Sequence, residues 1–432
     1  MTSVQLSPLR ARLAEAQEER ALTRGQVEVA ARPNVLVRLA FYASVFAIPF
    51  TELYLPGTGE RIGVVRLVQG LILLAAISQP RVCVRFVPVA LLWFGAYCGL
   101  RIAWGLWLTP ELVRDWWPTT LQWLEFFLPW SWVMFNVLQS PNLSKRGLWV
   151  LVGGCALCAL LHVAGIGTSE VGKGDEGRSS VFGQNANVIG TTYAVALIVL
   201  AAIGMLRQTN LKQRLLVIPL AGLIAIGLAK TGSRTGMMIV LTGMLMLLFQ
   251  SRTSLPRFER YTSLALIAAV LAMVLYQMPV VIERLETLTS AELRPEEARA
   301  RMFPVLWEIF LRSPIYGSGP DQYQFELTRR AMPYLVAEQR TITAHNLLLL
   351  VLVETGVIGL IPVALAFKTA LGAAWRARTK SLGWLPLALI VPLTLAGATG
   401  NPSSSPIFWL AMAYALAGGD RDEKFHNPGD NA

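Results

Sequence analysis

Charged side chains are scarce in this 432-residue chain: Asp, Glu, Lys and Arg make up 15% of it, whereas 54% is hydrophobic. A soluble protein needs a larger polar fraction to cover its surface, so the composition excludes an ordinary soluble domain. Cysteine is also rare, with four residues that form no recognisable disulfide framework. Cys155 and Cys158 have redox-like spacing, but they lie in an apolar run typical of helix packing.

Several chemical signatures are missing as well. The chain has three histidines and no cluster with metal-ligand spacing. Its short glycine motifs, at 172–174 and 317–319, do not make a phosphate-binding loop. We therefore expect no metal ion, no cofactor and no nucleotide hydrolysis. The net charge of +11 would suggest a nucleic-acid partner in a soluble protein. In a membrane protein the location of the basic residues matters more than the net charge, and we predict no nucleic-acid binding.

What the sequence does contain is a series of apolar runs of about 20 residues, the length that crosses a bilayer. The pattern predicts an all-α integral membrane protein with about twelve transmembrane helices. We place them near residues 36–55, 62–78, 86–108, 119–138, 147–166, 186–206, 214–230, 235–250, 261–279, 345–367, 382–399 and 404–418. The seventh and eighth adjoin at residues 230–236 and are expected to form a hairpin.

This pattern divides the chain into five parts. Residues 1–35 are expected to be a cytoplasmic N-terminal segment, because residues 1–31 contain no apolar core of a signal peptide. The first nine transmembrane helices occupy 36–279, a large outward loop 280–344, and the last three helices 345–418. Residues 419–432 form a cytoplasmic tail.

The basic residues predict the orientation. With the N-terminus inside, every inner loop carries at least two of them, which is the positive-inside pattern. Both termini are therefore expected to be cytoplasmic. The residues concerned are Arg81, Arg85, Lys145, Arg146, Arg207, Lys212, Arg214, Arg252, Arg257, Arg260, Arg376, Arg378 and Lys380.

The outward loop is long and has its own predicted structure. Glu296 to Leu311 has the periodicity of an amphipathic helix, residues 316–320 form a glycine-rich turn, and Asp321 to Tyr334 is a second short helix. Structured loops of this length usually serve as lids or binding elements.

A few basic residues break the positive-inside rule, because they lie on the outer side near membrane ends: Arg178, Lys230, Arg234, Arg299 and Arg301. Charge is costly at this depth, so a cluster facing a cavity is a functional hypothesis, although each residue could instead anchor to headgroups. Arginine suits phosphate or pyrophosphate, since its planar group donates two parallel hydrogen bonds.

His345 opens the tenth span directly after the large loop. A helix N-terminus and nearby arginines favour neutral imidazole, the form that a general base requires. An interfacial polar residue is the alternative. His162 is expected to be a packing histidine with a hydrogen-bond partner. Glu354 lies nine residues after His345, and a structural ion pair with another helix is the favoured interpretation for it.

These motifs resemble the O-antigen ligase/polymerase superfamily, and within it the O-antigen ligases. His345-Asn346, nine further residues and then Gly356-Val-Ile-Gly359 resemble the family's His-Asn…Gly-x-x-Gly signature. Ser233-Arg234 resembles its outward Ser-Arg turn, and Arg178 to Asn187 resembles its Arg…Asn-x-Asn stretch, with Ser180 where glycine is common. Arg301, or Arg299 in its place, with Trp307 and residues 313–319 resembles the loop pattern.

The resemblance covers about residues 175–360 and implies a GT-C-like membrane fold. It implies inverting, metal-independent transfer of a polymerised glycan from undecaprenyl pyrophosphate to the lipid A–core oligosaccharide, on the periplasmic face of a Gram-negative inner membrane. His345 would be the catalytic base, and Arg178, Arg234 and Arg301 would bind pyrophosphate. Weaker candidates for substrate binding are Asn187, Lys230 and Asn346, and Glu354, Gly356 and Gly359 would be structural.

Three other functions fit part of the pattern. An O-antigen polymerase, which uses another lipid-linked glycan as acceptor, shares these motifs. A protein-directed oligosaccharyltransferase is a further relative, usually longer than this chain. An anionic-solute transporter, from another functional class, would also place arginines outside, but it should show a paired internal repeat, which we do not see.

Overall fold

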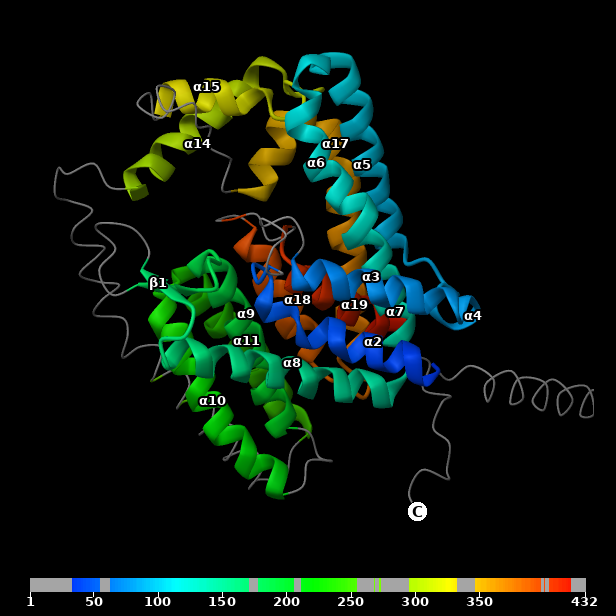
Figure 1. The fold of residues 1–432 in the computed structure, drawn as a ribbon. Coiled ribbons are helices and arrows are strands. Elements are labelled where there is room, and N and C mark those ends of the chain that lie inside the picture. The colour runs from blue at the N-terminus through cyan, green and yellow to red at the C-terminus, as the bar shows by residue number, and fades with distance from the viewer. Residues whose placement is uncertain are drawn as a thin grey trace, which may run out of the picture.

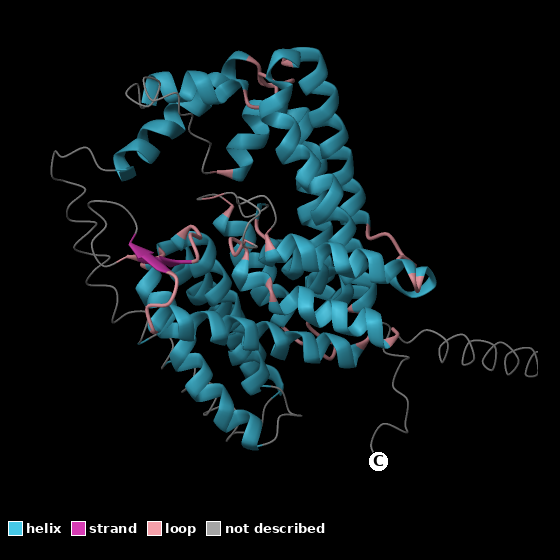
Figure 2. Cartoon of the chain, in the orientation of Figure 1, coloured by secondary structure: helices cyan, strands magenta, loops and turns pink. Residues whose placement is uncertain are grey.

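The computed structural model describes residues 33–54, 63–170, 178–205, 211–254, 295–331, 346–397 and 404–420, with single positions at 268, 272 and 400. Most of these residues are helical, and one small hairpin pairs β1 (Thr168–Glu170) antiparallel with β2 (Ser179–Val181) (Figures 1 and 2). Within these described ranges, four helices are long and apolar enough to cross a membrane: α5 (Val89–Leu108), α8 (Pro141–Val163), α9 (Ala186–Met205) and α17 (Leu347–Ala377).

The remaining helices are shorter, and most of them are apolar. They are α2 (Val35–Phe46), α3 (Val64–Ile77), α4 (Pro80–Cys83), α6 (Val113–Gln122), α7 (Leu128–Val137), α10 (Leu211–Thr231), α11 (Arg234–Ser254), α14 (Pro295–Arg312), α15 (Gln322–Ala331), α18 (Leu385–Ala396) and α19 (Pro406–Asp420). Three single turns join them, at Ile48–Phe50, Pro110–Leu112 and Trp123–Phe127.

Helices lie over eleven of the predicted spans, and the span near 261–279 falls outside the described residues except at positions 268 and 272. Several boundaries differ from the prediction: α2 ends at Phe46 rather than near 55, and α8 begins at Pro141 rather than near 147. Two further spans, the tenth and the fourth, differ in how they are built. The tenth span continues to Ala377 as α17, because the apolar run extends past Pro362 without a stop signal. The fourth span is divided into α6 and α7 by a π-helical turn at Trp123–Phe127, between Pro118 and Pro129.

The turn predicted at residues 230–236 is present, but the two helices that flank it, α10 and α11, both pack against α9. Glycines allow α10 and α11 to pack closely against α9. A Cβ added to Gly227 would lie 3.1 Å from Tyr193 of α9, and one added to Gly236 would lie 2.8 Å from the carbonyl oxygen of Gly190. As a result α9 is buried on almost every side, which explains why it is apolar throughout.

Helix ends predicted to lie on one side of the membrane contact one another. On the inner side, the Tyr414 hydroxyl of α19 donates to the Ser144 carbonyl of α8 (2.8 Å), and Lys380 after α17 donates to the Gly419 carbonyl at the end of α19 (2.7 Å). On the outer side, Lys230 at the end of α10 donates to the Val163 carbonyl at the end of α8 (3.2 Å). The packing therefore agrees with the alternation of the predicted spans.

The outward loop contains the two predicted helices. Glu296 to Leu311 lies within α14, and the second helix is α15. The apolar side of α14 packs against α15 and the first half of α17, with Met302, Leu306, Ile309 and Phe310 buried and Val305 partly buried. In Figure 1, α14 and α15 lie near the end of the molecule that α5, α6 and α17 reach.

Candidate active site

Arg178 contacts the turn that joins α10 to α11, and Arg234 directly follows this turn in the chain. Arg178 precedes β2, and its Nε donates to the Thr231 carbonyl of that turn (3.1 Å). One of its terminal nitrogens, Nη2, donates to Oδ1 of Asn187 in the first turn of α9 (3.4 Å). Arg234 is the first residue of α11. The structure thus brings together Arg178, Asn187 and Arg234, which the sequence separates by up to 56 positions.

Gly232 permits this arrangement. It has a φ of +56°, which L side chains rarely adopt, and a Cβ there would lie 2.8 Å from Cγ of Arg178. Ser233 is buried, and its hydroxyl accepts a hydrogen bond from the Gly236 amide (3.1 Å), which caps the first turn of α11. Arg234 is therefore presented by a fixed turn, and its guanidinium group adds to the positive potential of a helix N-terminus.

Asn346, the neighbour of His345, lies at the same end of the bundle. Phe249 of α11 stacks on Trp384 before α18, with ring centroids 5.7 Å apart, and Gly243 lies against Ala388. The two helices are therefore antiparallel. Arg234 lies nine residues before Gly243 on α11, and Gly397 lies nine residues after Ala388 on α18. Each stretch spans about 13 Å along its helix axis, so Arg234 and Gly397 lie at a similar level.

The first residue of α17 contacts the end of α18, because the Leu347 amide donates to the Gly397 carbonyl (2.8 Å). Asn346 caps α17 through its side-chain oxygen, which accepts from the Leu349 amide (3.0 Å). The N-terminus of α17 thus lies at the level of Arg234. His345 itself lies outside the described residues, as do the side chains of Arg299 and Arg301 in α14.

Helix α17 is broken at Gly356, which has φ +63° and ψ −162°. The break exposes backbone groups that residues 313–321, here called the clasp segment, satisfy. Ser318 and Gly319 donate to the Val353 and Glu354 carbonyls (2.7 and 3.0 Å), and the Val357 amide donates to the Pro314 carbonyl (2.9 Å). A Cβ on Gly356 would lie 2.2 Å from the Ile315 carbonyl oxygen, so only glycine allows this contact.

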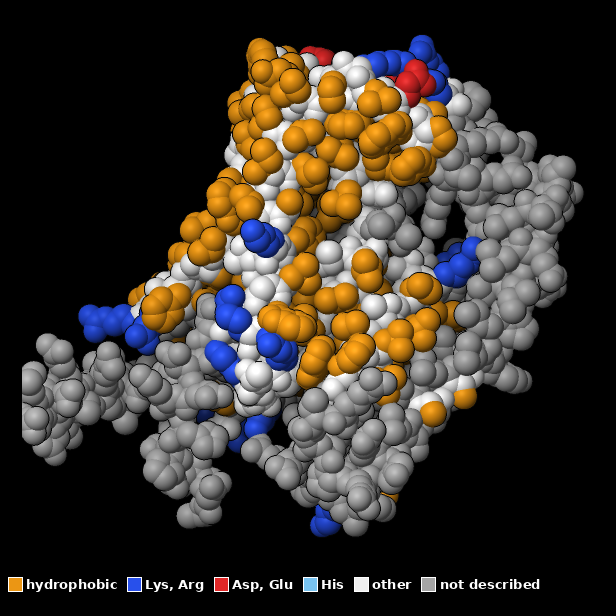
Figure 3. Space-filling view, turned by 180° about the vertical axis from the view of Figure 1, so that it is seen from behind, with side chains coloured by type: hydrophobic (Ala, Val, Ile, Leu, Met, Phe, Trp, Pro, Cys, Tyr) orange, Lys and Arg blue, Asp and Glu red, His pale blue; other side chains and the backbone are white. Residues whose placement is uncertain are grey.

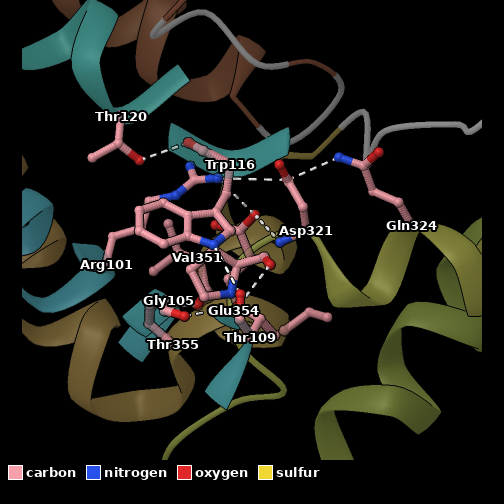
Figure 4. A network of polar contacts seen from close by, with 12 residues as sticks. Arg101, Gly105, Thr109, Trp116, Thr120, Asp321, Gln324, Val351, Glu354 and Thr355 are labelled. Atoms are coloured by element: carbon pink, nitrogen blue, oxygen red, sulfur yellow. Dashed lines mark hydrogen bonds and ion pairs between the residues drawn. The ribbon is translucent and has the colours of Figure 1, made fainter. Parts of the chain in front are cut away.

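A buried ionic network links α5 and α17 to Asp321 at the end of the clasp segment (Figure 4). Nη2 of Arg101 on α5 lies 3.2 Å from Oε1 of Glu354 and 3.5 Å from Oδ1 of Asp321. The same Glu354 oxygen accepts from the Asp321 amide (3.3 Å). The side chains of Arg101 and Glu354 are 2% and 0% exposed. Burial at this depth requires such pairing, and it identifies Arg101 as the partner that the sequence left unnamed for Glu354.

Sequence reasoning did not identify Arg101 and Asp321. The available signal was weak: one arginine inside the apolar run of α5, and one carboxylate in another span that needed a partner of opposite charge. Gly359 follows the break, and a Cβ there would meet the side chain of Thr355. Both glycines of the Gly-x-x-Gly motif therefore lie at a crowded bend.

Two further predicted residues have structural contacts. Lys230 holds the end of α8 through the Val163 carbonyl. His162 is buried and its Nε2 lies 2.8 Å from the Ser179 hydroxyl, so the expected packing role is confirmed. A separate hollow lies between residues 51–54, α3, the junction of α6 with the turn at Trp123–Phe127, and the start of α19. It is lined by Glu52, Arg66, Gln69 and Gln122 among others, and none of the candidate residues lines it.

The outer surface of α14 and α15 carries a network of exposed ion pairs. Glu308 contacts Arg312 (2.8 Å) and Arg330, and Glu326 contacts the same two arginines (2.7 and 3.3 Å). Hydrogen bonds from Arg330 and then Arg312 lower the pKa of Glu308 from 4.5 to about 2. This face is therefore charged and solvated.

Comparison with known proteins gives one family match. The family model described as O-antigen ligase matches residues 219–364, a stretch that includes Arg234, the clasp segment and the α17 break. No curated protein matches the chain. The family match confirms the predicted resemblance and implies O-antigen ligase/polymerase-type glycan transfer on lipid-linked substrates. Residues 219–364 thus resemble the O-antigen ligase family, within a multi-pass membrane protein whose described residues include four helices long and apolar enough to cross a bilayer.

Proposed function

We propose that this protein is an O-antigen ligase. It transfers a polymerised glycan from undecaprenyl pyrophosphate to a hydroxyl of the lipid A–core oligosaccharide, and so completes lipopolysaccharide. The observation that carries the proposal is the convergence of Arg178, Arg234 and the N-terminus of α17 at one end of the helical bundle.

The reaction joins the acceptor oxygen to the anomeric carbon of the donor sugar. As the new C–O bond forms, the bond from that carbon to the pyrophosphate breaks, and attack from the opposite face inverts the configuration. His345 accepts the proton of the acceptor hydroxyl. Undecaprenyl pyrophosphate leaves with the electron pair, and Arg178, Arg234 and Arg301 balance its charge.

The local structure supports these roles. Arg178 is held by the Thr231 carbonyl and Asn187, so its guanidinium group is oriented before substrate binds. Preorganised donors in a water-poor site stabilise developing charge better than mobile ones. Asn187, Lys230 and Asn346 complete the polar rim of the site. Arginine neutralisation of the leaving group requires no metal ion or cofactor.

The active site lies on the outer side of the membrane. About twelve helices in a GT-C-like arrangement cross the Gram-negative inner membrane, both termini are cytoplasmic, and the site opens to the periplasm. Residues 36–279 and 345–418 form the membrane part, 280–344 the periplasmic loop, and 1–35 and 419–432 the cytoplasmic ends. The undecaprenyl and lipid A chains then reach the site from the same leaflet.

The test is product analysis with purified full-length protein in lipid nanodiscs. We supply the undecaprenyl pyrophosphate-linked glycan with purified lipid A–core, and in a parallel reaction with the donor alone. Mass spectrometry should find glycan-modified lipid A–core in the first reaction only. A donor-only reaction that lengthens the lipid-linked glycan, with lipid A–core unmodified, would instead identify a polymerase.

A further inference from the structure

We propose that α14 is an interfacial helix, whose exposed apolar stripe docks into the boundary between lipid headgroups and acyl chains. The stripe consists of Phe303, Trp307 and Leu311, which are 53%, 43% and 57% exposed. They are spaced four residues apart and so share one side of the helix. This membrane contact is independent of which glycan the enzyme transfers.

Helix α14 has three different sides. Met302, Leu306 and Ile309 are buried against α15 and α17, and Glu308 and Arg312 carry the solvated ion pairs. At about 100° per residue, the stripe lies about 120° from each of these sides. The buried side already provides the packing that holds the helix in place, so three large exposed apolar residues in line are not needed for the fold. A charged side beside an apolar one is the pattern of helices that lie in a membrane interface.

Aromatic residues mark the level of that interface. Trp107 at the end of α5 is 67% exposed, and its ring contacts Tyr316 of the clasp segment (centroids 6.3 Å apart). Trp104 lies 6.2 Å from the same ring and donates to the Tyr316 carbonyl (2.7 Å). Trp and Tyr concentrate where a membrane meets water. Tyr316 follows the end of α14 by four residues, so the C-terminal end of α14 lies near this level.

Continuity with α5 identifies lipid as the occupant. Leu92 and Leu106 on this candidate membrane span are exposed, and in a bilayer such residues face acyl chains. Leu106 and Trp107 are exposed at the end of α5, and the Trp107 ring contacts Tyr316. Ile315 and Leu311, shortly before Tyr316 in the chain, are also exposed, so apolar residues lead from α5 to the stripe. Hydrophobic side chains cover much of the face in Figure 3 and extend to its top, where basic and acidic side chains lie together.

Site-directed fluorescence can test the proposal, because all four native cysteines are buried and should resist labelling. Single cysteines replace Phe303 or Leu311, and the matched control is Arg329→Cys on an exposed position of α15. Each full-length variant carries an environment-sensitive fluorophore and is reconstituted into vesicles of ordinary or acyl-brominated phospholipid. A thermal unfolding transition equal to that of the unlabelled protein confirms folding.

We expect bromolipid to quench the labels at 303 and 311 severalfold more strongly than the label at 329, with a blue-shifted emission. Equal quenching at all three positions would overturn the proposal. Blue-shifted emission at 303 and 311 without quenching would also overturn it, because the stripe would then be covered by protein rather than by lipid.

Discussion

Replacing Glu354 by leucine removes one partner of the buried pair that fastens α5 to the break in α17. The oxygen–nitrogen distance to Arg101 is 3.2 Å, which gives an attraction of about 5 kcal/mol at an effective dielectric constant of about 20. Breaking such a pair typically costs about 3–5 kcal/mol, because the remaining charge stays buried. Asp321 still offers Arg101 a carboxylate at 3.5 Å, so we expect about 3 kcal/mol for Glu354→Leu.

Two companion variants separate charge from shape. Glu354→Gln keeps an oxygen that accepts from Arg101 and from the Asp321 amide, so it should cost less than Glu354→Leu. The double variant Arg101→Met with Glu354→Leu leaves no buried charge at either position, and apolar replacement of a buried pair is often neutral. It should therefore be more stable than Glu354→Leu alone, by about 1–3 kcal/mol.

The assay is unfolding of the purified full-length variants in detergent, by denaturant or by heat, analysed as a double-mutant cycle. The test compares the loss in unfolding free energy of the double variant with the losses of Arg101→Met and Glu354→Leu alone. If the double variant loses the sum of the two single losses, Arg101 and Glu354 are not coupled, and the reasoning about this network is refuted.

Three further predictions concern the clasp, the Ser-Arg turn and the outer surface. Gly356→Ala should destabilise the protein by at least about 1–3 kcal/mol, since its φ of +63° strains any side chain and its Cβ meets Ile315, while Gly153→Ala in open space should be neutral in the same unfolding assay. Gly232→Val should displace Arg178 and lower glycan transfer on the order of 100-fold, whereas Gly222→Ala should retain activity; normal transfer by Gly232→Val would contradict the role of Arg178. The Tm difference between wild type and Glu308→Gln should be full above pH 4.5 and vanish as the pH falls towards about 2, because the pKa of Glu308 is lowered in the folded state; a difference that persists at pH 2 would argue against these ion pairs.

Apolar runs and the turn residues between them predicted most of the described helices. A segment that crosses a bilayer must be apolar along its whole length, and this requirement is visible in the local sequence. The Gly-rich turn before α11 and the amphipathic pattern of α14 were equally local, and both appear where expected. The hairpin of β1 and β2 was not predicted, since three-residue strands such as Thr168–Glu170 carry almost no periodic signal.

The contacts that position the candidate site depend on pairing between distant segments, which local patterns do not encode. Arg101 and Glu354 are 253 positions apart, and nothing near either residue indicates the other. Gly356 was assigned a structural role through its motif, yet the break in α17 depends on residues 313–321 satisfying the freed backbone groups. By contrast, the sequence singles out Arg178 and Arg234 as candidates because charge near the outer membrane boundary is unusual, and their role in the site stays a prediction.

The most direct measurement of the central claim is single-turnover transfer by purified His345→Ala and Arg234→Ala, with Arg329→Ala as the exposed-arginine control. A missing general base costs about 100- to 10,000-fold, and a missing charge on the leaving group costs a comparable factor. We predict that both site variants fold normally and lose at least about 100-fold in rate, while Arg329→Ala transfers glycan at the wild-type rate. Near-wild-type turnover by His345→Ala and Arg234→Ala would contradict the assignment of this end of the bundle as the active site.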